Sequence, residues 1–177
     1  MEAVKAASAE KYRWPMPEVY QEYLEALPIA PLRHRLQSPA RVAVVMVENR
    51  PLPWAAAVMN SFTYHLGPKW ESRQLCPDIH GQAAYNELLL TSAFWKQFDE
   101  DYILIVQSDA LCLRPLSPEF FNYAYIGAPC KGGVLNGGLS LRRRDVMIDA
   151  CSQRKSDSKV EDIFFTESVR DMLSGRV

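Results

Sequence analysis

The run Val42-Ala43-Val44-Val45-Met46-Val47 is the stretch that decides the fold. It is continuously apolar and rich in β-branched residues, and it ends abruptly at the polar sequence Glu48-Asn49-Arg50-Pro51. This pattern is typical of a strand that is buried on both faces of a sheet. We therefore expect it to be the first strand of a parallel sheet.

Alternating strand and helix patterns follow this run. Apolar residues recur at helical spacing from Trp54 to Leu66, and Gly67-Pro68 suits the end of that helix. A short strand is expected around residues 74–76, then a helix from Tyr85 to Phe98, and a second buried strand at Tyr102–Val106. This alternation predicts an α/β fold with a mixed, mainly parallel sheet flanked by helices.

The chain beyond Asp109 is expected to be more irregular. Four glycines lie between Lys131 and Gly138, and residues 139–141 alternate like a half-exposed strand. A closing helix is predicted from about Lys159 to Leu173, stopped by Gly175.

The first forty residues read as a separate extension. Prolines bracket one amphipathic helical segment, Pro17 to Leu27, and the basic cluster Arg33-His34-Arg35 is expected to be a solvated linker. We divide the chain into a proline-rich helical extension, residues 1–40, and one domain, residues 41–177.

Composition excludes several classes of partner. Lys and Arg total 20 against 21 Asp and Glu, a formal net charge of -1, which gives no reason to expect nucleic acid as a partner. No stretch is long and apolar enough to span a membrane, and no secretion signal is evident. The four cysteines form no C-x-x-C pair, so we expect reduced, buried thiols and a cytoplasmic protein.

Polar residues follow two of the predicted strands. Glu48 and Arg50 follow the first, and Gln107-Ser108-Asp109 follow the second. Ligands of open α/β sheets bind at the carboxyl ends of strands, so both groups are candidates. The alternative for Asp109 is a turn or a helix cap.

Two further motifs allow a functional and a structural interpretation. Asn136-Gly137-Gly138 would let the backbone approach a ligand closely, but Asn-Gly is also a leading hairpin turn. Glu161 and Asp162 are candidate catalytic acids, whereas Ser158-x-x-Glu161 also fits a capping box at a helix start. Acidic residues in a first helical turn can also be merely structural.

The order of these motifs resembles a family of uncharacterised glycosyltransferase-like proteins of the GT-A class. The resemblance covers about residues 41–169 and is most specific where the Tyr-Ile-Gly-Ala-Pro block is followed by Asn-Gly-Gly-x-Ser-Leu-Arg. The motifs that carry it are Val-Glu-x-Arg at 47–50, Tyr85-Asn86-x-Leu88-Leu89, Phe94-Trp95, Ile105-x-Gln107-Ser108-Asp109, Tyr125-Ile126-Gly127-Ala128-Pro129, Asn136-Gly137-Gly138-Leu139-Ser140-Leu141-Arg142-Arg143 and Glu161-Asp162-Ile163-Phe164-Phe165.

The resemblance implies a GT-A-like, Rossmann-like fold and a hexosyltransferase that uses a nucleotide-diphosphate sugar, with a UDP-sugar favoured, and a hydroxyl acceptor. It implies that Asp109 holds Mn²⁺ or Mg²⁺ and that Asp162 is the general base, with Glu161 positioning it or binding the acceptor. The donor sugar would be lined by Asn136, Gly137 and Gly138. Glu48 and Arg50 would border the nucleotide, and Gln107 and Ser108 stand where the class places its metal-binding motif.

The chain departs from the GT-A pattern in two respects. Only one aspartate stands where the common metal motif has two, and the sequence ends at Val177, before the segment that in this class often supplies a histidine ligand. His65 and His80 are expected to be core or surface residues rather than replacements for that ligand. These departures predict that the enzyme is truncated, degenerate or dependent on a partner.

Two other functions compete with transfer. A non-catalytic nucleotide- or sugar-binding module would keep the sheet and lose turnover. A doubly wound nucleotide-binding enzyme of another kind is less favoured, because no G-x-G-x-x-G or G-K-[ST] sequence follows a strand.

Overall fold

The computed structural model describes residues 40–66, 71–153 and 156–174. The predicted helix at Pro17–Leu27, the basic linker at Arg33-His34-Arg35 and the helix ends at Gly67-Pro68 and Gly175 lie outside the described residues.

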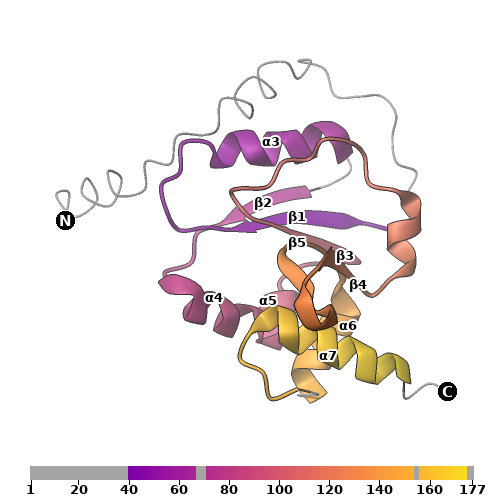
Figure 1. The fold of residues 1–177 in the computed structure, drawn as a ribbon. Helices are drawn as coiled ribbons and strands as arrows, with labels where there is room; N and C mark the ends of the chain where they lie inside the picture. The colour runs from indigo at the N-terminus through magenta and orange to yellow at the C-terminus, as the bar shows by residue number, and fades with distance from the viewer. Residues whose placement is uncertain (1–39, 67–70, 154–155, 175–177) are drawn as a thin grey trace.

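The core of the fold is one five-stranded sheet with the order β2-β1-β3-β5-β4. β1 pairs in parallel with β2 and β3, whereas β5 is antiparallel to both β3 and β4 (Figure 1). The strands are β1 (Val42–Val47), β2 (Glu71–Leu75), β3 (Tyr102–Val106), β4 (Tyr125–Pro129) and β5 (Leu135–Arg143). The prediction of an α/β fold with a mixed sheet is confirmed, but only two of the four strand pairings are parallel.

Helices cover both faces of the sheet. α3 lies on one face, and α4, α5, α6 and α7 lie on the other (Figure 1). Val44 points into the cluster beneath α3 and Val45 into the cluster beneath the four other helices, and both are fully buried. The continuous apolar run of β1 is explained, because both of its faces need apolar side chains. The helices are α3 (Ala55–Leu66), α4 (Gly81–Leu89), α5 (Ser92–Lys96), α6 (Arg144–Gln153) and α7 (Glu161–Ser174).

The predicted single helix from Tyr85 to Phe98 is wrong, because the chain forms α4 and α5 with a break between them. Thr91 caps α5, since its hydroxyl accepts a hydrogen bond from the Phe94 amide at 3.3 Å. The indole N–H of Trp95 then donates to the Leu89 carbonyl at 2.8 Å. Threonine at this cap and the indole together satisfy backbone groups at the junction of the two helices.

The hairpin-turn alternative for Asn136-Gly137 is also wrong. Both residues lie inside β5, and the turn between β4 and β5 is a 3₁₀ segment, η2 (Lys131–Gly133). Gly132 and Gly133 have φ values of 73° and 75° there, which glycine adopts without the steric penalty of other residues. β5 is therefore longer than the predicted strand at 139–141.

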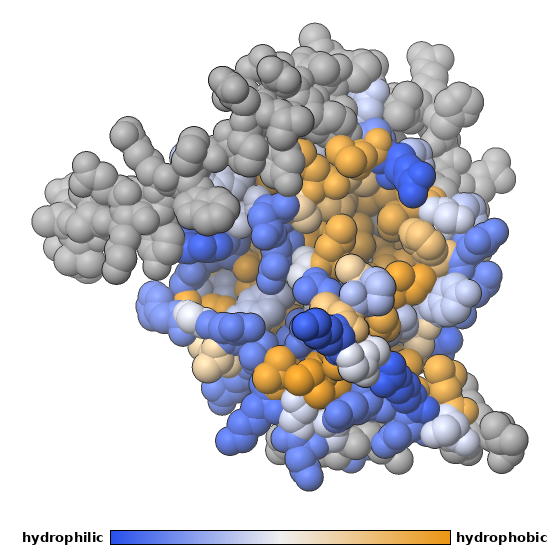
Figure 2. Space-filling model, in the orientation of Figure 1, coloured by the Kyte–Doolittle hydropathy of each residue, from blue (hydrophilic) through white to orange (hydrophobic). Residues whose placement is uncertain are grey.

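The second half of the chain is more regular than the sequence suggests. Besides β4 and β5 it contains α6, which the sequence reasoning did not predict, and a second 3₁₀ segment, η1 (Pro118–Asn122). The segment between β3 and η1 runs beside α3, where Figure 2 shows an apolar surface. Leu113 in this segment is 66% exposed.

The cysteines are all free, as expected, but only half of them are buried. Cys112 and Cys151 lie in the two apolar clusters, whereas Cys76 and Cys130 are exposed. Within the described residues, no helix combines the length and apolar character needed to cross a membrane.

Candidate functional site

The polar residues after β1 and β3 are neighbours at one edge of the sheet. Met46 is paired with Val106, so the chain places Glu48 beside Ser108 two residues further on. The Ser108 hydroxyl donates to Oε2 of Glu48 at 3.4 Å, and the Trp54 indole donates to the Ser108 carbonyl at 3.1 Å. The carboxyl ends of the parallel strands β1 and β3 thus lie side by side, at the edge of the sheet where open α/β folds bind ligands.

Glu48 and Arg50 form a bidentate ion pair at this edge. Nε of Arg50 lies 2.7 Å from Oε1 of Glu48, and Nη2 lies 2.5 Å from Oε2. Burial alone would raise the pKa of Glu48, but hydrogen bonds from Arg50 and Ser108 and the charge of Arg50 lower it overall. Glu48 is therefore an anion at neutral pH, while the Arg50 side chain stays 46% exposed.

Strand β5 extends past the end of β3 and carries the two glycines of the predicted site. Ile105 pairs with Ser140 in the antiparallel register, which brings Gln107 opposite Gly138. A Cβ atom on Gly138 would lie only 2.4 Å from Oε1 of Gln107, so the Gln107 side chain lies across this glycine. Asn136 is exposed, and its Oδ1 accepts a hydrogen bond from the Gly138 amide at 2.9 Å.

Glu161, the first residue of α7, is turned into the protein. Only 4% of the residue is exposed, and its Oε2 lies 2.8 Å from Nη1 of Arg142, which is fully buried. Arg142 also forms two hydrogen bonds: Nε donates to Ser140 Oγ at 2.8 Å and Nη2 donates to the Gly137 carbonyl at 3.1 Å. The pair joins the start of α7 to Arg142, the last residue but one of β5.

The capping-box alternative for Glu161 is therefore wrong. In such a box the Glu161 carboxylate would accept a hydrogen bond from the Ser158 amide. That amide instead donates to Ser156 Oγ at 3.1 Å, and the Ser158 hydroxyl accepts from the Val160 amide at 3.1 Å. The carboxylate of Glu161 is held by Arg142.

Arg142 is a residue of the site to which the sequence reasoning gave no role. Its guanidinium carbon lies over three aromatic rings, at 4.8 Å from the ring centre of Tyr125, 5.2 Å from that of Phe165 and 5.5 Å from that of Trp95. The sequence offers one signal for this role: Arg142 stands two residues after Ser140 in the strand, so the two polar side chains lie on the same face of β5.

Tyr85 of α4 is a second residue that the sequence reasoning did not assign. Burial raises the pKa of Tyr85 above its ordinary range, and the nearby charge of Glu161 adds to the rise. Tyr85 is therefore a neutral phenol at physiological pH, close to the charged groups of α7. Its proximity to Gln107 also places it at the end of β3.

Asp162 and Asp109 are the two carboxylates at this edge that the protein does not use internally. Asp162 directly follows Glu161, is half-buried, and lies close enough to Tyr85 for its charge to help raise the pKa of that phenol. Asp109 is exposed in the turn after Gln107. Neither carboxylate takes part in a hydrogen bond or ion pair with another of the described residues. Both are available to a ligand.

Asp109 has the donor chemistry of a magnesium or manganese ligand, because hard cations prefer carboxylate oxygen. In the part of the chain that the structure describes, no three His, Cys, Asp or Glu side chains are grouped so as to hold a metal ion. An ion at Asp109 would therefore need most of its ligands from another molecule or from water.

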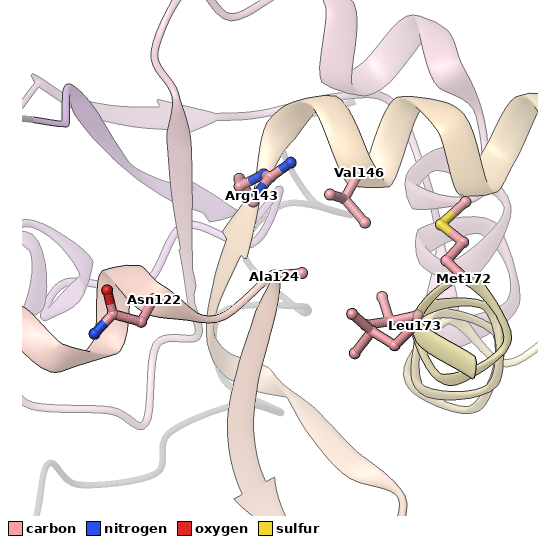
Figure 3. Close-up of a pocket in the computed structure, with 7 residues that line it drawn as sticks. Asn122, Ala124, Arg143, Val146, Met172 and Leu173 are labelled. Atoms are coloured by element: carbon pink, nitrogen blue, oxygen red, sulfur yellow. The ribbon is translucent and has the colours of Figure 1, made fainter. Parts of the chain in front are cut away.

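A small cavity lies at the other end of β5. Its volume is about 90 Å³, and Arg143, Val146 and Leu173 are among the residues that line it (Figure 3). Sites for small molecules usually measure roughly 300–1,000 Å³. We therefore do not assign this cavity to a ligand, and the candidate site is the edge formed by Glu48, Gln107, Gly137 and Glu161.

One family model matches the chain, over residues 71–176, and is described as a protein of unknown function (DUF5672). The matched region contains Gln107, Arg142 and Asp162, whereas Glu48 and Arg50 precede it. No curated protein matches the chain.

Proposed function

This chain belongs to the DUF5672 family of proteins of unknown function, and we propose that it transfers a sugar from a nucleotide-diphosphate sugar to a hydroxyl acceptor. The observation that carries the proposal is the course of β5 across the edge of the sheet. Gly138 lies against Gln107, which follows β3, and Gly137 lies against Glu161, which begins α7. The start of β5 therefore connects the carboxyl end of β3 with the start of α7. On this basis we assign Asp109 and Asp162 to one site.

The strand order supports a GT-A-like arrangement as the finer form of this fold. An antiparallel strand, β5, follows β3 in the sheet and directs its first residues towards the carboxyl ends of the parallel strands. The sequence motifs that resemble GT-A proteins lie on these elements. We extend the proposal to a donor site at the ends of β1 and β3, with UDP-sugars as the favoured donors.

Donor binding is assigned to the half of the site formed by β1, β3 and the start of β5. Arg50, which is half-exposed although it pairs with Glu48, offers positive charge to a phosphate. Gln107 and Asn136 offer amide groups to the sugar. Mn²⁺ or Mg²⁺ bound by Asp109 and by phosphate oxygens would neutralise the charge of the leaving diphosphate.

Transfer is assigned to Asp162. Its carboxylate accepts the proton of the acceptor hydroxyl as that oxygen forms a bond to the anomeric carbon of the donor. The bond from the anomeric carbon to the diphosphate oxygen breaks, and the nucleotide diphosphate leaves with the electron pair. Direct displacement of this kind inverts the configuration at the anomeric carbon.

A non-catalytic binding module is the second candidate. It is favoured by the single aspartate after β3 and by the absence of a three-residue metal cluster among the described residues. Such a module would bind the nucleotide sugar with Arg50, Gln107 and Asn136 and would not turn it over.

Calorimetric titration tests the proposal. The purified chain is titrated with UDP, then with other nucleotide diphosphates and nucleotide sugars, with and without Mn²⁺. We expect Mn²⁺-dependent binding that Asp109→Ala weakens at least about tenfold, which is roughly 1.4 kcal/mol. Asp149→Ala, an exposed aspartate of α6, is the matched control. Absence of binding to every donor would refute the proposal, and binding without turnover would favour the binding module.

A further inference from the structure

Arg142 is a charged side chain with no exposed surface. It forms an ion pair with Glu161 and donates hydrogen bonds to Ser140 and to the Gly137 carbonyl. Three aromatic rings surround its guanidinium group. The Glu161 carboxylate balances the charge of the guanidinium group, as a buried arginine requires.

Stability alone gives a weak reason for this pair. Removing two charges from water is costly, and replacing a buried ion pair by uncharged side chains of similar volume is often neutral or stabilising. What the pair does provide is a fixed connection between two elements. It attaches the first residue of α7 to β5, which is itself fixed by pairing with β3 and β4.

The room for Glu161 comes from Gly137. A Cβ atom at residue 137 would lie 1.9 Å from Oε1 of Glu161 and 2.7 Å from Nη2 of Arg142. The Glu161 carboxylate is therefore held between the guanidinium group of Arg142 and the bare backbone of β5. Asp162 is the next residue of the same helical turn, so fixing Glu161 also fixes the backbone from which the Asp162 side chain extends.

We propose that Arg142 is a positioning residue, which acts through Glu161 to fix the first turn of α7 and thereby the carboxylate of Asp162. The role of Asp162 as the general base rests on the proposed function. The attachment of α7 to β5 does not, and it can be measured separately.

The test uses the double variant Arg142→Met/Glu161→Gln, which removes both charges and keeps similar volumes. We expect its melting temperature to stay within about 5 °C of the wild type, because no unpaired charge remains. We expect the dissociation constant for UDP to change less than about threefold and kcat to fall at least about tenfold, because the base is displaced rather than the donor site.

The matched control is Arg143→Met/Asp145→Asn, which removes the neighbouring ion pair. Nε of Arg143 lies 2.8 Å from Oδ1 of Asp145, but this pair is largely exposed. We expect wild-type kcat in this variant, since it does not connect β5 to α7.

Hydrogen exchange gives the readout that does not depend on activity. In Arg142→Met/Glu161→Gln, the amides of residues 164–166, whose hydrogen bonds close the first turn of α7, are expected to exchange at least about tenfold faster, while those of β3 keep their protection. A folded double variant with wild-type kcat overturns the proposal. If the wild type itself lacks turnover, the proposed function fails, and unchanged exchange at residues 164–166 then overturns the attachment. Should the double variant not fold, Glu161→Gln alone is judged by the same two measurements.

Discussion

The carboxylate of Glu161 occupies the space that a side chain at Gly137 would need, since a Cβ atom there would lie 1.9 Å from Oε1. Glycine is therefore required at residue 137 by packing against the buried Glu161 carboxylate. Gly138 differs, because the atom nearest to its absent Cβ belongs to Gln107, which is exposed. Two adjacent glycines therefore serve different parts of the site.

Gly137→Ala is expected to destabilise the fold by about 1–3 kcal/mol, the usual effect of overpacking a buried site. The added methyl group must displace the Glu161 carboxylate, which is buried and held by Arg142. Urea unfolding followed by circular dichroism measures the change in the free energy of unfolding.

Gly138→Ala is the control for this prediction. The Gln107 side chain is exposed and can rotate away, so we expect a loss below about 1 kcal/mol. Equal losses in the two variants would contradict the different roles of the glycines.

Much of the sheet could be predicted from the sequence because its strands are continuously apolar. β1 was expected at Val42–Val47 and β3 at Tyr102–Val106, and both are observed with these bounds. The predicted closing helix, Lys159 to Leu173, corresponds to α7 at Glu161–Ser174. In each case one local pattern of apolar residues is sufficient, because the element buries a whole face or both faces.

Local patterns failed where a distant partner decided the conformation. Ser158-x-x-Glu161 and Asn136-Gly137 both match common local motifs, but Arg142 draws Glu161 into the core and β5 continues through the asparagine. Neither the Arg142–Glu161 ion pair nor the continuation of β5 through Asn136 can be recognised from residue spacing. Each depends on how β5 is placed in the sheet beside β3. The roles of Arg142 and Tyr85 were missed for the same reason.

Acid is expected to destabilise the protein partly through Glu48. Its pKa is lowered in the folded state, because the hydrogen bonds and charge of Arg50 outweigh the effect of burial. The ion pair therefore contributes stability above the pKa of an unfolded glutamate, about 4.3, and that contribution is lost as the pH falls through the folded pKa. Urea unfolding between about pH 7 and pH 3 measures this loss.

Glu48→Gln should flatten this dependence, so that the variant and the wild type converge at low pH. Glu119→Gln, at an exposed glutamate of η1, is the control and should keep the wild-type slope. Parallel curves for Glu48→Gln and the wild type would contradict the assignment.

The four thiols should fall into two classes of reactivity. Cys76 and Cys130 are exposed, whereas burial raises the pKa of Cys112 to about 11 and Cys151 lies in the apolar cluster. At about pH 8 the Cys112 thiol therefore stays protonated and unreactive. Titration with 5,5′-dithiobis(2-nitrobenzoate) should show two fast thiols in the native protein and four in denaturant. Four fast thiols in the native protein would contradict the burial.

Asp162→Asn should separate donor binding from transfer. Asparagine keeps the shape of the side chain but cannot accept the proton of the acceptor hydroxyl, so we expect kcat to fall by roughly 10²–10⁴-fold, the usual contribution of a general base. The dissociation constant for the donor should change less than about twofold, because the donor site is assigned to β1, β3 and the start of β5.

Asp171→Asn, at an exposed aspartate on the same helix, controls for the loss of a negative charge on α7. Full transfer by Asp162→Asn would remove Asp162 as the base. A parallel loss of donor affinity and kcat would instead place Asp162 in the donor site, because a base acts on the acceptor and contributes only as the hydroxyl is deprotonated.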